Sequence, residues 1–94
     1  MEVIKELTRF YKIATKDERI GHIHICLYMA LFQCWNLNGF KNPILVSRNQ
    51  LMKVAKINGR ATYHKCIKQL QVYGYIQYFP SYHPGIGSRI YLLR

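Results

Sequence analysis

The sequence predicts an α+β fold that is mainly helical, in which three to four helices precede a carboxy-terminal β-hairpin. Two observations lead to this prediction. Apolar residues recur at helical spacing over much of the first 73 residues, whereas residues 75–93 contain two β-branched and aromatic runs separated by turn residues. The 94 residues, half of them hydrophobic, are expected to form a single domain over residues 1–94 with a core of its own.

Two helices are expected first. Residues 3–14 carry apolar side chains on one helical face, which predicts an amino-terminal helix within residues 1–15. Thr15-Lys16-Asp17-Glu18 has the Thr-x-x-Glu form of a capping box and predicts a second helix that runs to about Leu37. Because apolar residues lie on several sides of this segment, we expect the second helix to be the centre of the core.

A short strand and a short helix are expected next. Residues 44–46 are all aliphatic and indicate a short β segment after the turn residues of 38–43. Ser47 and Gln50 fit a second capping box, which opens a helix. Asn58 and Gly59 are expected to end it, because these residue types readily adopt a left-handed conformation. The side chains expected to point inward are Leu51, Val54 and Ala55.

The last helix and the hairpin complete the order. With Asn58 as its N-cap, a helix is predicted from about Arg60 to Tyr73, where Gly74 ends it. Strands over residues 75–79 and 89–93 follow, joined by a loop of turn residues, 80–88. The inward face of the helix is expected to consist of Tyr63, Cys66, Ile67, Leu70 and Tyr73.

This order of elements favours DNA as a partner. A short helix, a turn that contains glycine and a second helix form a helix-turn-helix unit, here over residues 47–73. A β-hairpin directly after it, residues 75–93, makes the unit a winged helix-turn-helix. Since an α-helix fits the major groove of B-DNA, the second helix of the unit is the expected recognition helix.

The distribution of charge also points to a polyanion. Fourteen Lys and Arg residues outnumber four acidic residues and give a formal net charge of +10. All four acids lie in the first 18 residues, and residues 19–94 hold ten basic residues and no Asp or Glu. A folded domain repels itself under such a balance, which a bound nucleic acid would relieve. Cationic membrane peptides share such a balance, but they carry it on one amphipathic helix and not across a domain with a core, so nucleic acid is the better partner.

The candidate DNA-binding residues are polar side chains on the expected exposed surfaces. The recognition helix offers five of them on its outward face, suited to guanine edges or to phosphates. The preceding helix offers two at its start, where backbone phosphates are expected to pass, and the wing offers three. These residues are Arg60, Thr62, His64, Lys65 and Lys68; Arg48 and Asn49; and His83, Ser88 and Arg89.

Parts of the chain resemble a known family. The ending Leu70-x-x-x-Gly74-x-Ile76 matches the junction of recognition helix and wing, and ALFQCWN (30–36) resembles a first core helix. Over roughly residues 19–93 the sequence is similar to winged-helix domains of bacterial mobile elements. Among these, it looks like the amino-terminal domains of phage replisome organisers and primosome-assembly proteins, and more distantly like MarR-type regulators. The resemblance implies DNA contact by residues after Gly59, but helicase loading is not implied, since the carboxy-terminal domain of full replisome organisers is not expected here.

The sequence therefore predicts sequence-specific binding of double-stranded DNA by a small transcription regulator or an accessory factor of a mobile element. A protein-interaction adaptor in a replication or transfer complex and an RNA-binding module are the alternatives. A homodimer through the amino-terminal or the second helix is one possible partner arrangement, and packing of these helices within the monomer is the other. Without a signal peptide or membrane span, and with an odd number of cysteines, the protein is expected in the cytoplasm.

No catalytic residues, cofactor or metal are expected. His22, His24 and Cys26 have partly ligand-like spacing, but a structural zinc site needs four ligands and packing explains these residues better. The aromatic residues of the carboxy-terminal part could stack on single-stranded nucleic acid, although core packing and cross-strand pairs are the favoured interpretation. Those aromatic residues are Tyr73, Tyr75, Tyr78, Phe79, Tyr82 and Tyr91.

Overall fold

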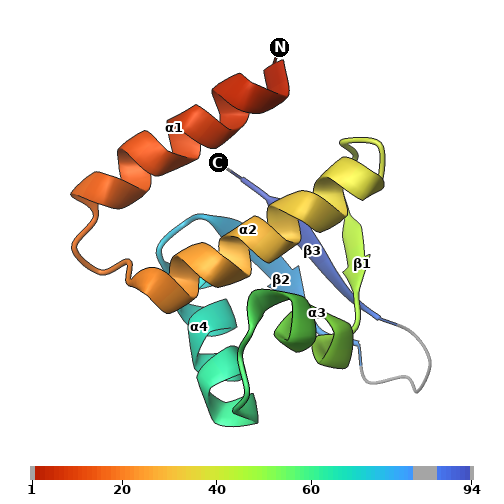
Figure 1. The fold of residues 1–94 in the computed structure, drawn as a ribbon. Helices are drawn as coiled ribbons and strands as arrows, with labels where there is room; N and C mark the ends of the chain where they lie inside the picture. Colours follow the sequence, from red (N-terminus) through yellow and green to blue (C-terminus); the bar gives the residue numbers. More distant parts are fainter. Residues whose placement is uncertain (1, 82–86, 94) are drawn as a thin grey trace.

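The computed structural model describes residues 2–81 and 87–93, and these residues form four helices and three strands (Figure 1). The strands make one antiparallel sheet, so the predicted α+β class with mainly helical content is confirmed. In chain order the elements are α1 (Glu2–Lys16), α2 (His22–Leu37), β1 (Ile44–Val46), α3 (Arg48–Ala55), α4 (Arg60–Val72), β2 (Ile76–Phe79) and β3 (Ser88–Leu92).

Helix α1 packs its apolar face against the rest of the chain. Phe10 and Ala14 are buried, and Val3 and Leu7 lie partly buried against the core. The ring of Phe10 stacks on that of Tyr28 in α2, with centroids 3.8 Å apart and planes 6° from parallel. The apolar spacing of residues 3–14 therefore serves packing within the monomer.

The predicted start of the second helix at Thr15 is wrong. Helix α1 continues to Lys16, and the Thr15 hydroxyl donates to the carbonyl of Lys12 at 3.2 Å. Asp17 accepts a hydrogen bond from the backbone N–H of Arg19, which favours a turn at this point. Helix α2 begins only at His22, after Gly21 as N-cap.

Helix α2 is the centre of the core, as its apolar pattern predicts. The helix contacts α3, α4 and the strands β1 and β3, and it crosses in front of the sheet in Figure 1. Within the described part of the chain, no helix is long and apolar enough to cross a membrane. The residues of α2 that are buried are Leu27, Tyr28, Ala30, Leu31 and Phe32.

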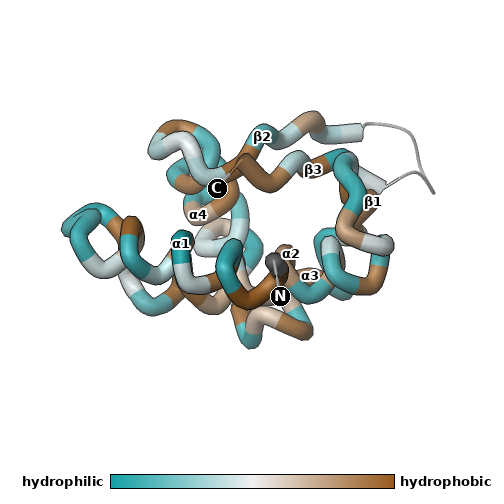
Figure 2. Tube along the Cα trace, turned by 90° about the horizontal axis from the view of Figure 1, so that it is seen from above, coloured by the Kyte–Doolittle hydropathy of each residue, from teal (hydrophilic) through white to brown (hydrophobic). Residues whose placement is uncertain are grey.

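The sheet has the order β1-β3-β2, with β3 in the middle. Ile90 of β3 lies opposite Ile44 on one side and Tyr78 on the other. Ile44, Val46, Ile76 and Ile90 are buried, so one side of the sheet faces the helices. Figure 2 shows the strands along one margin of the molecule, with α1, α2 and α3 on the other side of them.

Helix α3 begins at the predicted N-cap but does not bury all of the residues predicted to point inward. Ser47 is the N-cap, since its hydroxyl accepts from the N–H of Gln50 at 3.4 Å. However, Val54 is 58% exposed and Met52 takes the inward position beside Leu51 and Ala55. The helix is short enough that its apolar spacing allows either choice, and packing decides between them.

The turn between α3 and α4 also uses different residues from those predicted. Lys56, with φ of 62°, adopts the left-handed conformation that was expected of Asn58 or Gly59. Gly59, rather than Asn58, is the N-cap of α4. The inward face of α4 is as predicted, because Tyr63, Cys66, Ile67 and Leu70 are buried and Tyr73 is half-buried.

Phe10→Ala removes the ring that joins α1 to α2. We expect a loss of about 3–5 kcal/mol in the free energy of unfolding, because a buried aromatic side chain leaves a cavity. Urea denaturation measures this loss. Ile4→Ala is the control in the same helix, since Ile4 is 62% exposed and its truncation should cost less than about 0.5 kcal/mol.

Gly87→Ala tests the close approach of β3 to β1. A Cβ at Gly87 would lie 2.8 Å from the carbonyl oxygen of Val46, and backbone cannot swing away as a side chain can. We expect a loss of about 1–3 kcal/mol, measured by urea denaturation. Gly21→Ala is the control, because a new Cβ at Gly21 comes no nearer than 3.8 Å to His24. It should lower the free energy of unfolding by no more than the difference between glycine and alanine at an N-cap.

Candidate nucleic-acid interface

Helix α4 presents the five residues that the sequence places on its outward face. Arg60, Thr62, His64, Lys65 and Lys68 are all exposed, whereas the opposite face of the helix is buried in the core. Residues four apart lie one above another on a helix, so Arg60, His64 and Lys68 form a row. Burial raises the pKa of Tyr63 to about 12, which keeps this inward hydroxyl neutral.

The amino end of α4 is open to an anion. Its N-cap, Gly59, has no side chain to accept from the first-turn amides, and the first turn contains no acidic residue. The N–H groups of that turn therefore lack partners within the helix and carry the positive end of its dipole. Arg60 and Thr62 place polar side chains at the same end.

A groove joins α3, α4 and the hairpin. It has a volume of about 550 Å³ and is open to solvent. Four of the predicted residues line it, namely Arg48, Asn49, His64 and Ser88. Three distant segments of the chain thus bring their polar side chains together, which local sequence patterns could not predict. The other lining residues are Val46, Ser47, Tyr78, Pro80, Ser81 and Gly87.

Arg48 is the most constrained side chain of this groove. It is half-buried, and its Nε is buried without a hydrogen-bond partner among the described residues. A buried donor that lacks an acceptor is costly, more so when it is charged. Because Arg48 begins α3, a phosphate oxygen in the groove could accept from its guanidinium and from the first-turn amides together.

The predicted wing residues do not lie together. Ser88 points to the groove side of β3, where its hydroxyl lies 3.4 Å from that of Tyr78. Arg89 is the next residue and pairs with Leu45 and Phe79, so its side chain projects from the opposite side of the sheet. His83 lies outside the described residues.

Acidic side chains do not neutralise this surface. Where the structure describes side chains, its ion pairs are Glu6 with Arg9 and Asp17 with Arg19, the latter at 2.9 Å. Both pairs lie at residues 6–19, outside α3, α4 and the hairpin. The bases of α3 and α4 therefore keep their full charge for an external partner.

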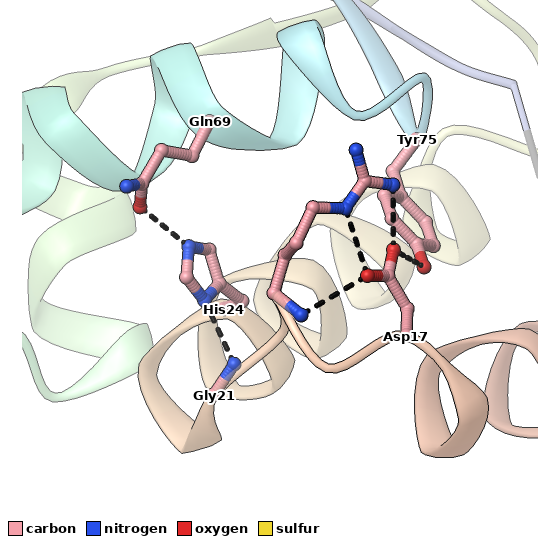
Figure 3. A network of polar contacts seen from close by, with 6 residues as sticks. Asp17, Gly21, His24, Gln69 and Tyr75 are labelled. Carbon is pink, nitrogen blue, oxygen red and sulfur yellow. Dashed lines mark hydrogen bonds and ion pairs between the residues drawn. The ribbon is translucent and has the colours of Figure 1, made fainter.

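A polar network that the sequence did not reveal holds α4 against α2 (Figure 3). Nδ1 of His24 accepts from the N–H of Gly21 at 3.0 Å, so its proton is on Nε2, 2.7 Å from Oε1 of Gln69. Asp17 accepts from the Tyr75 hydroxyl at 2.9 Å and from Arg19. This network assigns His24 a structural role.

Arg19 is held by the same network. Its guanidinium lies 4.2 Å from the centroid of the Tyr73 ring, a cation–π distance. The hydrogen bonds from Arg19, together with that from Tyr75, hold the pKa of Asp17 well below its usual range, although burial opposes them. Arg19 thus has a structural role and is not one of the basic residues that lack an ion pair.

Two of the cysteines are partly or fully buried, and the third is exposed near His22. Burial raises the pKa of the Cys34 and Cys66 thiols. His22 and Cys26 are exposed and line a pocket of about 360 Å³ beside the amino end of α4. Over residues 2–81 and 87–93, no three His, Cys, Asp or Glu side chains gather in a group that could hold a metal ion.

Comparison with models of protein families, with curated proteins and with solved structures finds no match to this chain. The assignment of function therefore depends on the residues and geometry described above.

Asp17→Asn should destabilise the fold at neutral pH, because it removes the carboxylate that Arg19 and Tyr75 bind. Since the folded state lowers the pKa of Asp17 from 3.8, its stabilising effect is present above that value and is lost as the pH falls through the folded pKa. Thermal unfolding across an acid titration should show the difference between variant and wild type shrinking in acid.

Glu18→Gln is the control, because it removes the same charge from the exposed neighbouring side chain. A difference between Asp17→Asn and wild type that stays constant down to the lowest pH would contradict this account of the network.

Proposed function

We propose that this chain is a winged-helix protein that binds double-stranded DNA, with α4 in the major groove. The order α3, turn, α4 and hairpin is that of a helix-turn-helix with a wing, and the pairing of β1 with β3 ties the hairpin to the start of α3. The proposal includes the narrower role of a small transcription regulator or accessory factor of a mobile element.

The observation that carries the proposal is the unneutralised basic surface of α4. Arg60, Lys65 and Lys68 are exposed on a helix whose other face is core, and no acid occurs after residue 18. A helix of this kind can lie in the major groove, where Arg and Lys bind guanine edges or phosphates. Thr62 and His64 would contact bases or phosphates from the same face.

The groove beside α4 would take the DNA backbone. A phosphate there would accept from the guanidinium of Arg48, whose Nε otherwise has no partner among the described side chains. Asn49 and Ser88 would donate from either side of the groove. In this arrangement Ser88 is the described wing residue on the duplex side, and contact by His83, which lies outside the described residues, stays a prediction.

A single module of this kind buries only about 600–1,000 Å² of protein surface on DNA, so tight binding to one site favours two copies. Phe10 is within the core, which leaves Ile4 and Tyr11 of α1 and Leu37 of α2 as exposed apolar residues for such a contact. We therefore place a homodimer contact, where one forms, on these residues.

Binding to random-sequence duplex DNA across a salt series tests the proposal. We expect a steep dependence of log affinity on log salt, because bound bases release counterions from the phosphates. Lys65→Ala and Lys68→Ala should each weaken binding and reduce the slope by about one where a phosphate contact is lost. Arg60→Ala should weaken binding in the same assay. Fluorescence anisotropy with a labelled duplex measures both quantities.

Lys5→Ala and Lys12→Ala are matched controls, because they remove the same charge from exposed positions of α1. Equal effects of the α1 and α4 variants would mean that only net charge matters and would remove α4 from the interface. If the wild type does not bind duplex DNA at low salt, a role as a protein-interaction adaptor becomes the better interpretation. Equal affinity for RNA and duplex would favour the RNA-binding alternative.

A further inference from the structure

One side of the sheet carries residues that neither the core nor the proposed duplex contact uses. The strand register places Leu45, Arg89 and Phe79 in one row, and Tyr91 opposite Gln77 in the next. Directly paired residues of antiparallel strands point to the same side, so these five side chains project together. We call them the outer sheet face.

The outer sheet face is not covered by the helices. Leu45 is 66% and Phe79 43% exposed, while the buried residues of the same strands point to the helices. Figure 2 shows α1, α2 and α3 on the opposite side of the strands. The solvent side of such a sheet is normally polar, but here Leu45, Phe79 and Tyr91 take three of its five positions beside Gln77 and Arg89. Exposed apolar surface of this kind marks a binding site.

Its aromatic residues suit flat, unpaired bases. Phe79 and Tyr91 lie with ring centroids 5.8 Å apart and planes 83° from parallel, so one ring meets the other edge-on. Tyr75 is buried, and Tyr73 and Tyr78 are half-buried. Phe79 is exposed and Tyr91 is half-buried, and these two are the described aromatic residues that the strand register places on the outer sheet face, where they can stack on a base.

The charge of Arg89 favours nucleic acid over a second copy of the chain as the partner of the outer sheet face. It is exposed at the middle of the row and has no ion pair among the described side chains. If two copies stacked these faces about a two-fold axis, their arginines would meet, in a protein with a net charge of +10. A phosphate beside a stacked base would instead neutralise Arg89.

We propose that the outer sheet face binds single-stranded DNA, with bases on Phe79 and Tyr91 and a phosphate at Arg89. The bases of a duplex are paired and stacked, so this site is distinct from that of α4. Only the choice of DNA over RNA rests on the proposed function. Because the groove with His64 and Ser88 lies on the inner side of the same hairpin, a duplex with an unpaired tail can contact both surfaces.

The test compares three labelled probes by fluorescence anisotropy: an oligothymidylate of about 12 nucleotides, an abasic strand of the same length and a blunt duplex. The abasic strand has the same phosphates but nothing to stack. We expect the wild type to bind oligothymidylate about tenfold more tightly than the abasic strand. Phe79→Leu and Tyr91→Leu should each remove about tenfold of that affinity and leave duplex binding unchanged, since leucine is apolar but has no ring.

Phe40→Leu is the matched control, because Phe40 is an aromatic residue between α2 and β1 with 45% exposure, close to the 43% of Phe79. Equal binding of the two single strands overturns the proposal, and so do equal losses in Phe40→Leu and Phe79→Leu. Tighter binding of an oligouridylate of the same length overturns the choice of DNA. If Phe79→Leu changes the sedimentation of the protein but not its affinity for oligothymidylate, the face belongs to a second copy. Base-dependent binding of the single strand without duplex binding contradicts the proposed function alone.

Discussion

The stack of Phe10 on Tyr28 is the contact on which the rest of the structure depends. Tyr75 meets both rings edge-on, with centroids 5.8 and 6.4 Å away. The three rings come from α1, from α2 and from the turn between α4 and β2, so one buried cluster fixes three segments that are far apart in the sequence. Burial raises the pKa of Tyr28 above its usual range, so its hydroxyl stays neutral within this cluster.

This cluster also helps to place the acidic Asp17 away from the first turn of α4. It brings the Tyr75 hydroxyl to Asp17, which in turn binds Arg19, so this acid is satisfied at the α1 end of the molecule. The first turn of α4 lies at the other end (Figure 1), and there the bases have no acid to bind. The net charge follows from composition alone, whereas the pairing of Asp17 with Tyr75 and Arg19 follows from the fold. The basic residues of α4 have no ion pair among the described side chains, which is why we propose a polyanion as the partner.

The sequence predicts the helices and strands better than the residues at which they begin and end. Apolar spacing identified the inward face of α4, and Ser47 was found as a cap because its hydroxyl needs only a nearby amide. The Thr15 cap failed, because Asp17 offers the backbone a competing turn and because Tyr75, 58 residues away, binds it there. Likewise Lys56 takes the left-handed conformation although glycine does so at lower cost, since tertiary packing sets where the turn falls.

In the candidate site, too, some features follow from the local sequence and others only from the fold. Exposure of Lys65 and Lys68 follows from helical period, whereas the buried Nε of Arg48 depends on segments that meet only in the fold. Ser88 and Arg89 are adjacent in sequence and were grouped as wing contacts, yet strand alternation places them on opposite sides of the sheet. The hairpin therefore has two different surfaces, with polar residues on the groove side and Arg89 beside the rings of Phe79 and Tyr91 on the other side. Because a duplex presents grooves and phosphates while an unpaired strand also presents base faces, the two sites that we propose would bind different states of the same polymer.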